Sequence, residues 1–198
     1  RINGNSGLRL SGGTRNLLIS NCNLGNIQFL GSGNDSIVSF RNNKIGSISV
    51  NGLTEFPVRR LNIACNQFSL KNSAGLISRA VVLQGCRNSR LDSNVILSEY
   101  NQQVFEPQVF STGVLIRSCS QLGISSNLVT VRSKSAFQNS QNIFQIWEVS
   151  DPTNVSNIAN ESSSSSSSTI FSFKANGGDL KEYIVVHQND FYLQEAVS

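Results

Sequence analysis

The chain is poor in charged and aromatic residues and contains no methionine. Of its 198 residues 14% are charged and 8% are aromatic, with one His and one Trp, whereas an ordinary globular domain carries about 25% charged residues. No apolar run approaches the roughly 18 residues that a membrane-spanning helix needs, so the sequence predicts no membrane insertion. The absence of Met and of a signal peptide indicates a mature product or a piece of a longer chain.

Small neutral polar residues are abundant instead. The chain holds 24 Asn and 33 Ser, residue types that favour turns and caps over helix interiors. This composition disfavours an intracellular helical protein. Aliphatic residues and Phe recur throughout, which disfavours a disordered chain. The length suits one domain over residues 1–198 with a sizeable core.

The charge is distributed unevenly along the chain. Residues 1–90 carry 11 Lys and Arg against 2 acids, whereas residues 91–198 carry 5 against 10. A basic half is compatible with an anionic partner, and equally with a solvated surface or with packing between copies. No basic motif with interleaved aromatic residues is present, so we predict no nucleic-acid partner.

One motif recurs along the chain: apolar, x, apolar, x, x, Asn, x, apolar. Its Asn position is occupied, at intervals of 21, 23, 28, 33, 33 and 29 residues, by Cys22, Asn43, Asn66, Asn94, Asn127, Asn160 and Asn189. Cys22 replaces Asn in the first copy, and the copy at Asn160 is degraded. Alternating apolar residues predict strands with one buried face. Stacked Asn side chains can hydrogen-bond to one another as a ladder.

This periodicity predicts an all-β fold, a parallel β-helix or solenoid of about seven rungs. The alternative is an antiparallel sandwich. The Asn-bearing repeats resemble the right-handed parallel β-helix of the pectate-lyase-like superfamily, which includes polysaccharide lyases, hydrolases and bacteriophage tailspikes. The resemblance covers most of residues 7–191. It implies a polysaccharide partner, an extracellular or virion location and, in the tailspike branch, a homotrimer, but no matched motif assigns a catalytic residue.

Longer repeats place their extra residues in surface loops, where binding sites often lie. The expected insertions are residues 98–112 and 132–142 and a Ser-rich loop at 161–169. A glycosidase needs two carboxyl groups about 5–9.5 Å apart, and the candidate catalytic acids are Glu99, Glu106 and Glu148. Aromatic rings can stack on sugars, and cations can neutralise a uronate. Together with one further acid, such residues are the candidates for substrate binding: Tyr100, Phe105, Arg117, Arg132, Trp147 and Asp151. The alternative is that the aromatic residues anchor the loops and that Trp147 belongs to the core.

Metal and cofactor sites are not expected. The four cysteines lack CxxC spacing, and no Gly-rich phosphate loop is present. Cys86 and Cys119 occupy equivalent positions in the repeats VLQGCRNSRLDSN and LIRSCSQLGISSN. We therefore expect them to stack inside the fold as free thiols. A disulfide is the alternative, since the Cα spacing of stacked strands allows one, although stacked side chains have poor dihedral geometry for it.

Three functions remain open at this stage. The leading hypothesis is a polysaccharide-binding module of a tailspike-like or adhesin-like homotrimer, with glycan degradation left open. The second is a secreted monomeric polysaccharide lyase or glycoside hydrolase. The third is a purely structural rod of a virion or cell surface.

Overall fold

The described part of the chain contains only β-strands. A computed structural model describes residues 7–11, 13–31, 36–53, 56–72, 79–100, 113–117, 119–133, 144–149, 153–158, 161–164, 171–175 and 182–195. These residues form nineteen strands and no helix. Every strand pairing among them is parallel, which excludes the antiparallel sandwich.

The strands form two sheets. Sheet B has seven strands in the order β15 (Thr153–Ile158), β18 (Glu182–His187), β12 (Ser120–Ser125), β9 (Cys86–Asp92), β6 (Val58–Ala64), β4 (Ser36–Arg41) and β2 (Arg15–Ser20). Sheet A has 12 strands and divides into two columns that meet in β3 (Asn23–Leu30) and β5 (Lys44–Asn51). The start of β5 pairs with one column and its end pairs with the other.

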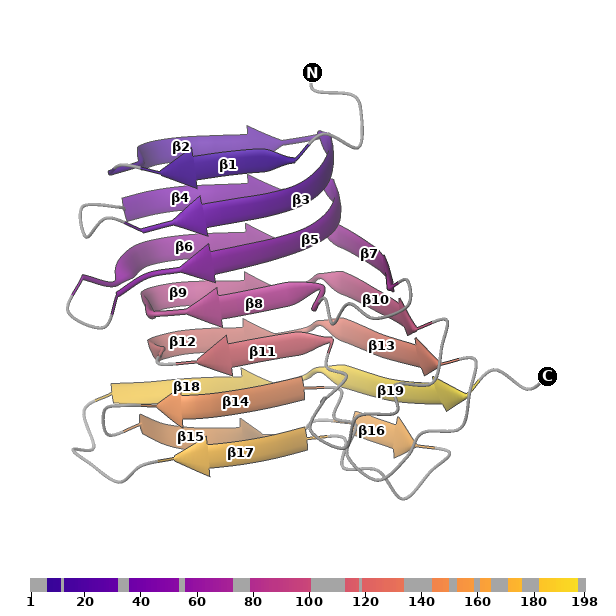
Figure 1. The fold of residues 1–198 in the computed structure, drawn as a ribbon. Coiled ribbons are helices and arrows are strands. Elements are labelled where there is room, and N and C mark those ends of the chain that lie inside the picture. Colours follow the sequence, from indigo (N-terminus) through magenta and orange to yellow (C-terminus); the bar gives the residue numbers. More distant parts are fainter. Residues whose placement is uncertain are drawn as a thin grey trace.

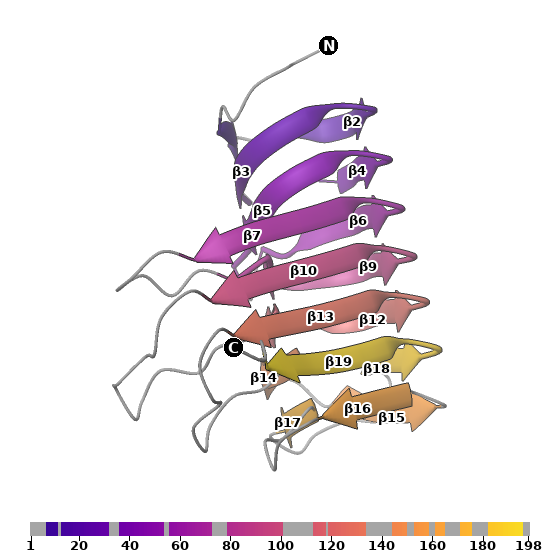
Figure 2. The ribbon, with the colours of Figure 1, turned by 90° about the vertical axis from the view of Figure 1, so that its right-hand side faces the viewer.

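The two columns of sheet A are named here A1 and A2. Column A1 contains β7 (Gln67–Asn72), β10 (Val95–Tyr100), β13 (Leu128–Ser133), β19 (Asp190–Glu195) and β16 (Glu161–Ser164). Column A2 contains β1 (Leu8–Ser11), β8 (Val81–Gln84), β11 (Val114–Arg117), β14 (Phe144–Val149) and β17 (Phe171–Ala175). The chain runs from an A2 strand to a sheet B strand to an A1 strand, and this three-strand unit is called a layer below. Layers stack on one another (Figures 1 and 2), an arrangement compatible with a parallel β-helix.

In the strands whose side chains are described, alternate residues point into the stack and form its core. In sheet B, equivalent inward positions of successive layers are in register, and one such row is Ile19, Phe40, Ile63, Leu91, Ile124 and Val186. All of these except the half-buried Ile19 are buried, as are the large side chains of Phe29, Phe68 and Phe191. Burial of one face of the described central strands explains the period-two pattern of their sequences.

The predicted asparagine ladder is present at the corner between sheet B and column A1. Asn43, Asn66, Asn94, Asn127 and Asn189 are 0–2% exposed. Each of the first four donates from its side-chain Nδ2 to the Oδ1 of the next, at 2.9–3.1 Å. The same Oδ1 atoms also accept the backbone N–H of the preceding Asn. The second Nδ2 hydrogen reaches a carbonyl of the previous layer, such as Ile63 O for Asn94, so the buried amides are satisfied on both sides.

A left-handed backbone residue precedes every ladder position. Their φ angles are 51–56°, and they are Asn21, Asn42, Cys65, Ser93, Ser126 and Gln188. The N–H groups of the first five still donate to the neighbouring layer, as Ser93 does to Ser125 O at 2.9 Å. A non-glycine residue in this region costs about 1–3 kcal/mol. The continuous hydrogen bonding and the ladder beside each corner offset that cost.

The last layers do not stack in sequence order. Asn127 donates directly to Asn189, 62 residues away, because β18 and β19 pair with β12 and β13. The intervening β15 and β16 pair on the far side of β18 and β19 (Figure 1). The repeat at Asn160 carries Asn157 and Ser162 where complete copies carry apolar residues. The strands of this repeat, β15 and β16, lie at the end of the strand order in the two sheets.

Removing one ladder amide should destabilise the fold strongly. Asn94→Ala deletes the acceptor of two Asn66 N–H groups and the donor to Ile63 O and Asn127 Oδ1. We expect a loss of about 3 kcal/mol in the free energy of unfolding, because buried polar groups lose their partners. Urea denaturation measures it. Asn62→Ala, at a half-buried outer position of β6, is the matched control, and equal losses in both variants would contradict a special role for the ladder.

Candidate functional site

Glu99 lies in a row of alternating charge on the outer face of column A1. The register places it between Lys71 of β7 and Arg132 of β13. Its carboxylate oxygens lie 3.8 Å from Lys71 Nζ and 3.7 Å from Arg132 Nη1. The structure therefore brings together two predicted site residues, Glu99 and Arg132, and adds Lys71, which the sequence analysis missed. The sequence contains a pattern that could have identified Lys71, because each of the three residues is the fifth after a ladder Asn.

This row is better suited to ion pairing than to acid catalysis. A glycosidase pairs its acid with a second carboxyl group, whereas Glu99 forms its ion pairs with two cations, Lys71 and Arg132. Both cations are largely exposed, and exposed pairs of this kind contribute less than about 1 kcal/mol each. The row carries more positive than negative charge, which favours an anionic or hydroxyl-rich ligand over a basic one.

The other predicted site residues are separated from Glu99 or lie outside the described residues. Arg117 ends β11, and its register partner in β14 is Trp147. The arrowheads of β8 and β11 point in the opposite direction to those of β10 and β13 (Figure 1), so Arg117 is not brought to Glu99. Only the backbone is described for Tyr100, Glu148 and Trp147, while Phe105, Glu106 and Asp151 lie outside the described residues.

The predicted insertions begin within strands. Residues 98–100 end β10, residues 132–133 end β13, and residues 161–164 form β16. The remainder of the three expected loops lies outside the described residues. The proposed aromatic platform therefore remains a prediction.

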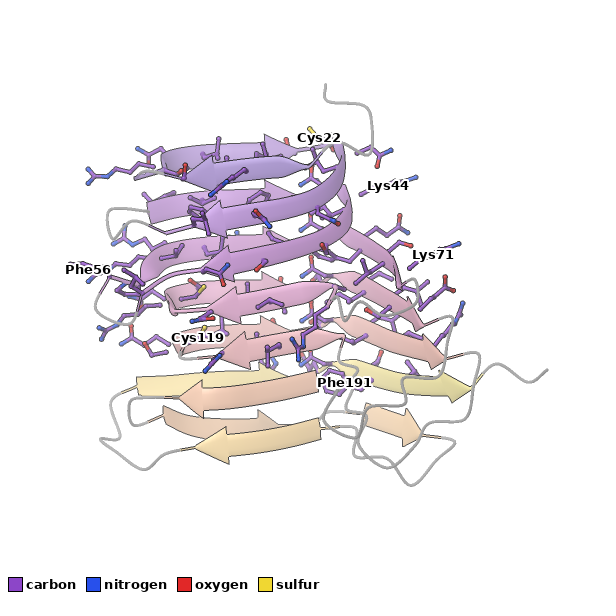
Figure 3. The ribbon with its side chains drawn as sticks, viewed as in Figure 1. Cys22, Lys44, Phe56, Lys71, Cys119 and Phe191 are labelled. Atoms are coloured by element: carbon purple, nitrogen blue, oxygen red, sulfur yellow. The ribbon has the colours of Figure 1, made fainter. Side chains whose placement is uncertain are left out.

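A shallow groove with a mixed polar and apolar lining crosses four layers beside the ladder corner. It consists of two depressions, of about 390 and 270 Å³, that share Lys44 and Gln67. The outer lining is provided by exposed polar side chains and glycine, chiefly Asn23, Lys44, Gly46, Gln67 and Ser69. Figure 3 shows Lys44 projecting outward from the stack. The groove is called the Lys44 groove below.

Glycine keeps part of the Lys44 groove open. A Cβ atom at Gly46 would lie 3.1 Å from Asn26 Oδ1 and 3.2 Å from Gly25 O, so a side chain there would crowd the neighbouring strand and fill the groove. The groove combines an ammonium, an amide and a hydroxyl group. These groups can donate and accept hydrogen bonds with a sugar. The sequence analysis missed this site because it lies in regular repeats rather than in an insertion.

Cys86 and Cys119 stack inside the fold as free thiols, as predicted. Both are 1% exposed, and the Cys86 N–H donates to Cys119 Sγ at 3.3 Å. Figure 3 labels Cys119 beside sheet B. The hydrogen bond with Cys119, together with burial, raises the pKa of the Cys86 thiol well above its usual value. A thiol with a raised pKa is a poor nucleophile at neutral pH, so this pair is structural.

The described residues contain neither a cluster suited to a metal ion nor a helix suited to a membrane. Among the described residues, no group of three His, Cys, Asp or Glu side chains is placed to hold a metal ion. The described residues also include no helix of the length and apolarity needed to cross a membrane.

The four thiols should differ sharply in reactivity. In native protein at pH 8 we expect iodoacetamide to label the exposed Cys65 first and Cys22 more slowly. Cys86 and Cys119 should stay unlabelled, because burial blocks access and the raised pKa of Cys86 keeps it protonated. Peptide mass spectrometry with and without urea measures the labelling. Rapid labelling of Cys86 in native protein would contradict the buried stack.

Comparison with known proteins adds no family to this description. No protein family, curated protein or solved structure matches the chain.

Proposed function

We propose that the chain is a right-handed parallel β-helix of about seven rungs that binds a polysaccharide. It would act as a module of a tailspike-like or adhesin-like protein on a virion or outside the cell. The Lys44 groove is the observation that carries this proposal, because it is a preformed surface that extends along the stack. The parallel pairing and the seven strands of sheet B support the helical architecture.

The groove suits an extended polymer better than a compact ligand. Sites for small molecules are usually deep clefts that enclose most of the ligand, whereas this groove is shallow and extends over four layers. Parallel strands stack about 4.8 Å apart. Because Asn23, Lys44 and Gln67 are equivalent positions of successive layers, a linear glycan that lies along the stack meets a polar group at each layer.

Degradation of the glycan has less support than binding. The charged partners of Glu99 are cations, which favour its role as an ion-pairing residue. A lyase or hydrolase reaction would then depend on Glu106, Glu148 or Asp151. If such a reaction occurs, Glu106→Gln or Glu148→Gln should abolish it, whereas Glu99→Gln should not.

Loss of the Lys44 ammonium should weaken glycan binding. We expect Lys44→Ala, and separately Gln67→Ala, to weaken binding about tenfold each, in line with a hydrogen bond to a charged or polar group. A glycan array identifies the ligand, and affinity electrophoresis in gels that contain it measures the change. Lys71→Ala is the control, since it removes the same charge outside the groove. An equal loss for Lys71→Ala, or no retardation of the native protein by any glycan, would contradict the proposal.

The oligomeric state tests the tailspike-like part of the proposal. We expect a mass near three times 21.5 kDa by light scattering coupled to size exclusion, because the tailspike-like part of the proposal implies a homotrimer. A mass near 21.5 kDa would instead favour the monomeric enzyme hypothesis for this chain. Measurement at several protein concentrations separates a stable trimer from weak association.

A further inference from the structure

Most of the large apolar side chains that the described residues expose lie on sheet B or on the turn that leads into it. Leu18 of β2 and Ile37 of β4 are 61% and 44% exposed. Leu53 and Phe56, between β5 and β6, are 59% and 53% exposed. The fifth such side chain lies in the Lys44 groove. Figure 3 shows Phe56 on the side of the stack opposite Lys44, so these four side chains are separate from the proposed glycan site.

The turn before β6 combines apolar and basic side chains. The N–H of Phe56 donates to the carbonyl oxygen of Leu53 at 3.1 Å, which holds both residues in one tight turn. The strand that follows begins with one buried residue and then carries the exposed Arg59 and Arg60. Glu55, the single acid in the sequence of residues 36–91, belongs to the same segment and lies outside the described residues.

Ile37 continues this surface onto the neighbouring layer. It occupies the position of β4 that corresponds to Arg60 of β6, because the residues on either side of the two are register partners. Leu18 and Ile37 line a shallow depression of about 280 Å³, together with Arg41. The term apolar–basic patch is used below for Leu18, Ile37, Leu53, Phe56, Arg59 and Arg60.

The backbone at Ile37 is strained in a way that core packing does not explain. Its φ is 58°, and among the described residues with positive φ it is the only β-branched one. The corresponding positions of β2 and β9 carry Asn16 and Asn88, and Asn tolerates this conformation better than Ile does. Since the Ile37 side chain is exposed, burial does not offset the strain. Strained residues cluster at functional surfaces, so an apolar side chain is expected to have a role at this position.

We propose that the apolar–basic patch binds the surface of a bilayer that contains anionic lipids, without crossing it. Exposed apolar side chains rimmed by polar ones are typical of protein or membrane contacts. The apolar side chains would enter the boundary between headgroups and acyl chains, while the arginines bind lipid phosphates through paired hydrogen bonds. Each basic residue near an anionic bilayer strengthens binding about fivefold. This inference does not depend on glycan binding.

The charge of this region favours a bilayer over a second copy of the chain. Residues 1–90 carry 11 Lys and Arg against 2 acids, and contact between two such patches would bring like charges together. A nucleic acid would also meet the arginines, but single strands bind by stacking their bases on aromatic side chains, and Phe56 is the one aromatic residue of the patch. An anionic bilayer accommodates both the charge and the apolar side chains.

Sedimentation with lipid vesicles tests the role of charge. Native protein should bind vesicles of equal parts phosphatidylcholine and phosphatidylglycerol at least about tenfold more tightly than vesicles of phosphatidylcholine alone, and added salt should weaken binding. Arg59→Gln/Arg60→Gln should lose about 25-fold in affinity. Gln is tolerated there, since Gln121 occupies the position corresponding to Arg60 with a φ of 51°. Arg9→Gln/Lys71→Gln removes the same charge from sheet A and should bind within about twofold of native protein.

The apolar side chains are tested separately. Leu53→Ser/Phe56→Ser should lose at least about tenfold in affinity for the mixed vesicles. Ile37→Asn should weaken vesicle binding about threefold and raise the melting temperature, because Asn relieves the backbone strain while it removes the apolar contact. A residue with a purely structural role would not show these opposite effects. Thermal unfolding also shows whether each variant is folded.

Several outcomes would overturn the inference. Equal binding of native protein to both kinds of vesicle, or to neither, would remove the anionic bilayer as the partner. Unchanged binding by Leu53→Ser/Phe56→Ser, or an equal loss in Arg9→Gln/Lys71→Gln, would leave only general charge attraction. A changed mass of Leu53→Ser/Phe56→Ser in light scattering would assign the patch to contact between copies, and tighter binding of single-stranded DNA than of vesicles would assign it to nucleic acid. Glycan binding through the Lys44 groove should persist in every patch variant, so the two proposals can fail independently.

Discussion

Asn66, Asn94 and Asn127 each donate to the amide of the next ladder residue and accept two N–H groups from the residue before. At the ends of the ladder, Asn43 accepts the N–H of Cys22, and Asn189 donates to the backbone carbonyls of Ile124 and His187. Such a chain is fully satisfied only when every layer presents Asn at the same place, because an unpaired amide in the core costs about 1–3 kcal/mol. The ladder therefore fixes the register of all layers between Asn43 and Asn189. The register in turn decides which side chains share a row on the outside, such as Glu99 with Lys71 and Arg132, or Arg59 with Arg87.

Much of this architecture was predictable because it depends on local spacing. The Asn motif predicted the strands, the ladder and the stacking of Cys86 on Cys119. Short apolar runs were ambiguous. In VVL and VLI nearly every residue is apolar, so period two does not show that Val82 and Leu115 face outward while Leu83 and Ile116 are buried. A repeat motif also does not specify which copies are neighbours in the stack. The hydrogen bond between Asn127 and Asn189 could therefore be found only in the structure.

The candidate sites were less predictable than the fold. The sequence analysis looked for binding residues in insertions, which form loops, whereas these sites lie in the regular repeats. Among the described residues, the Lys44 groove and the charged rows lie on regular strands. Lys44 directly follows Asn43, and Lys71 is the fifth residue after Asn66, so both can be found by counting from the ladder. Their chemistry depends on which residues of other layers lie beside them, and that information is absent from any single repeat. For Tyr100 and Trp147, strand placement alone does not define a sugar-binding surface.

The out-of-order end of the stack affects how the molecule can assemble. Among the described strands, β15 pairs with β18 and β16 pairs with β19, and both partners follow them in the chain. During synthesis, β15 and β16 therefore emerge before the strands that they join exist. The earlier layers can add one after another as the chain grows, but this end requires residues 182–195 to dock on β12 and β13 first. Folding of the final layer must thus wait for the C-terminal strands, and contacts between residues far apart in sequence slow that step.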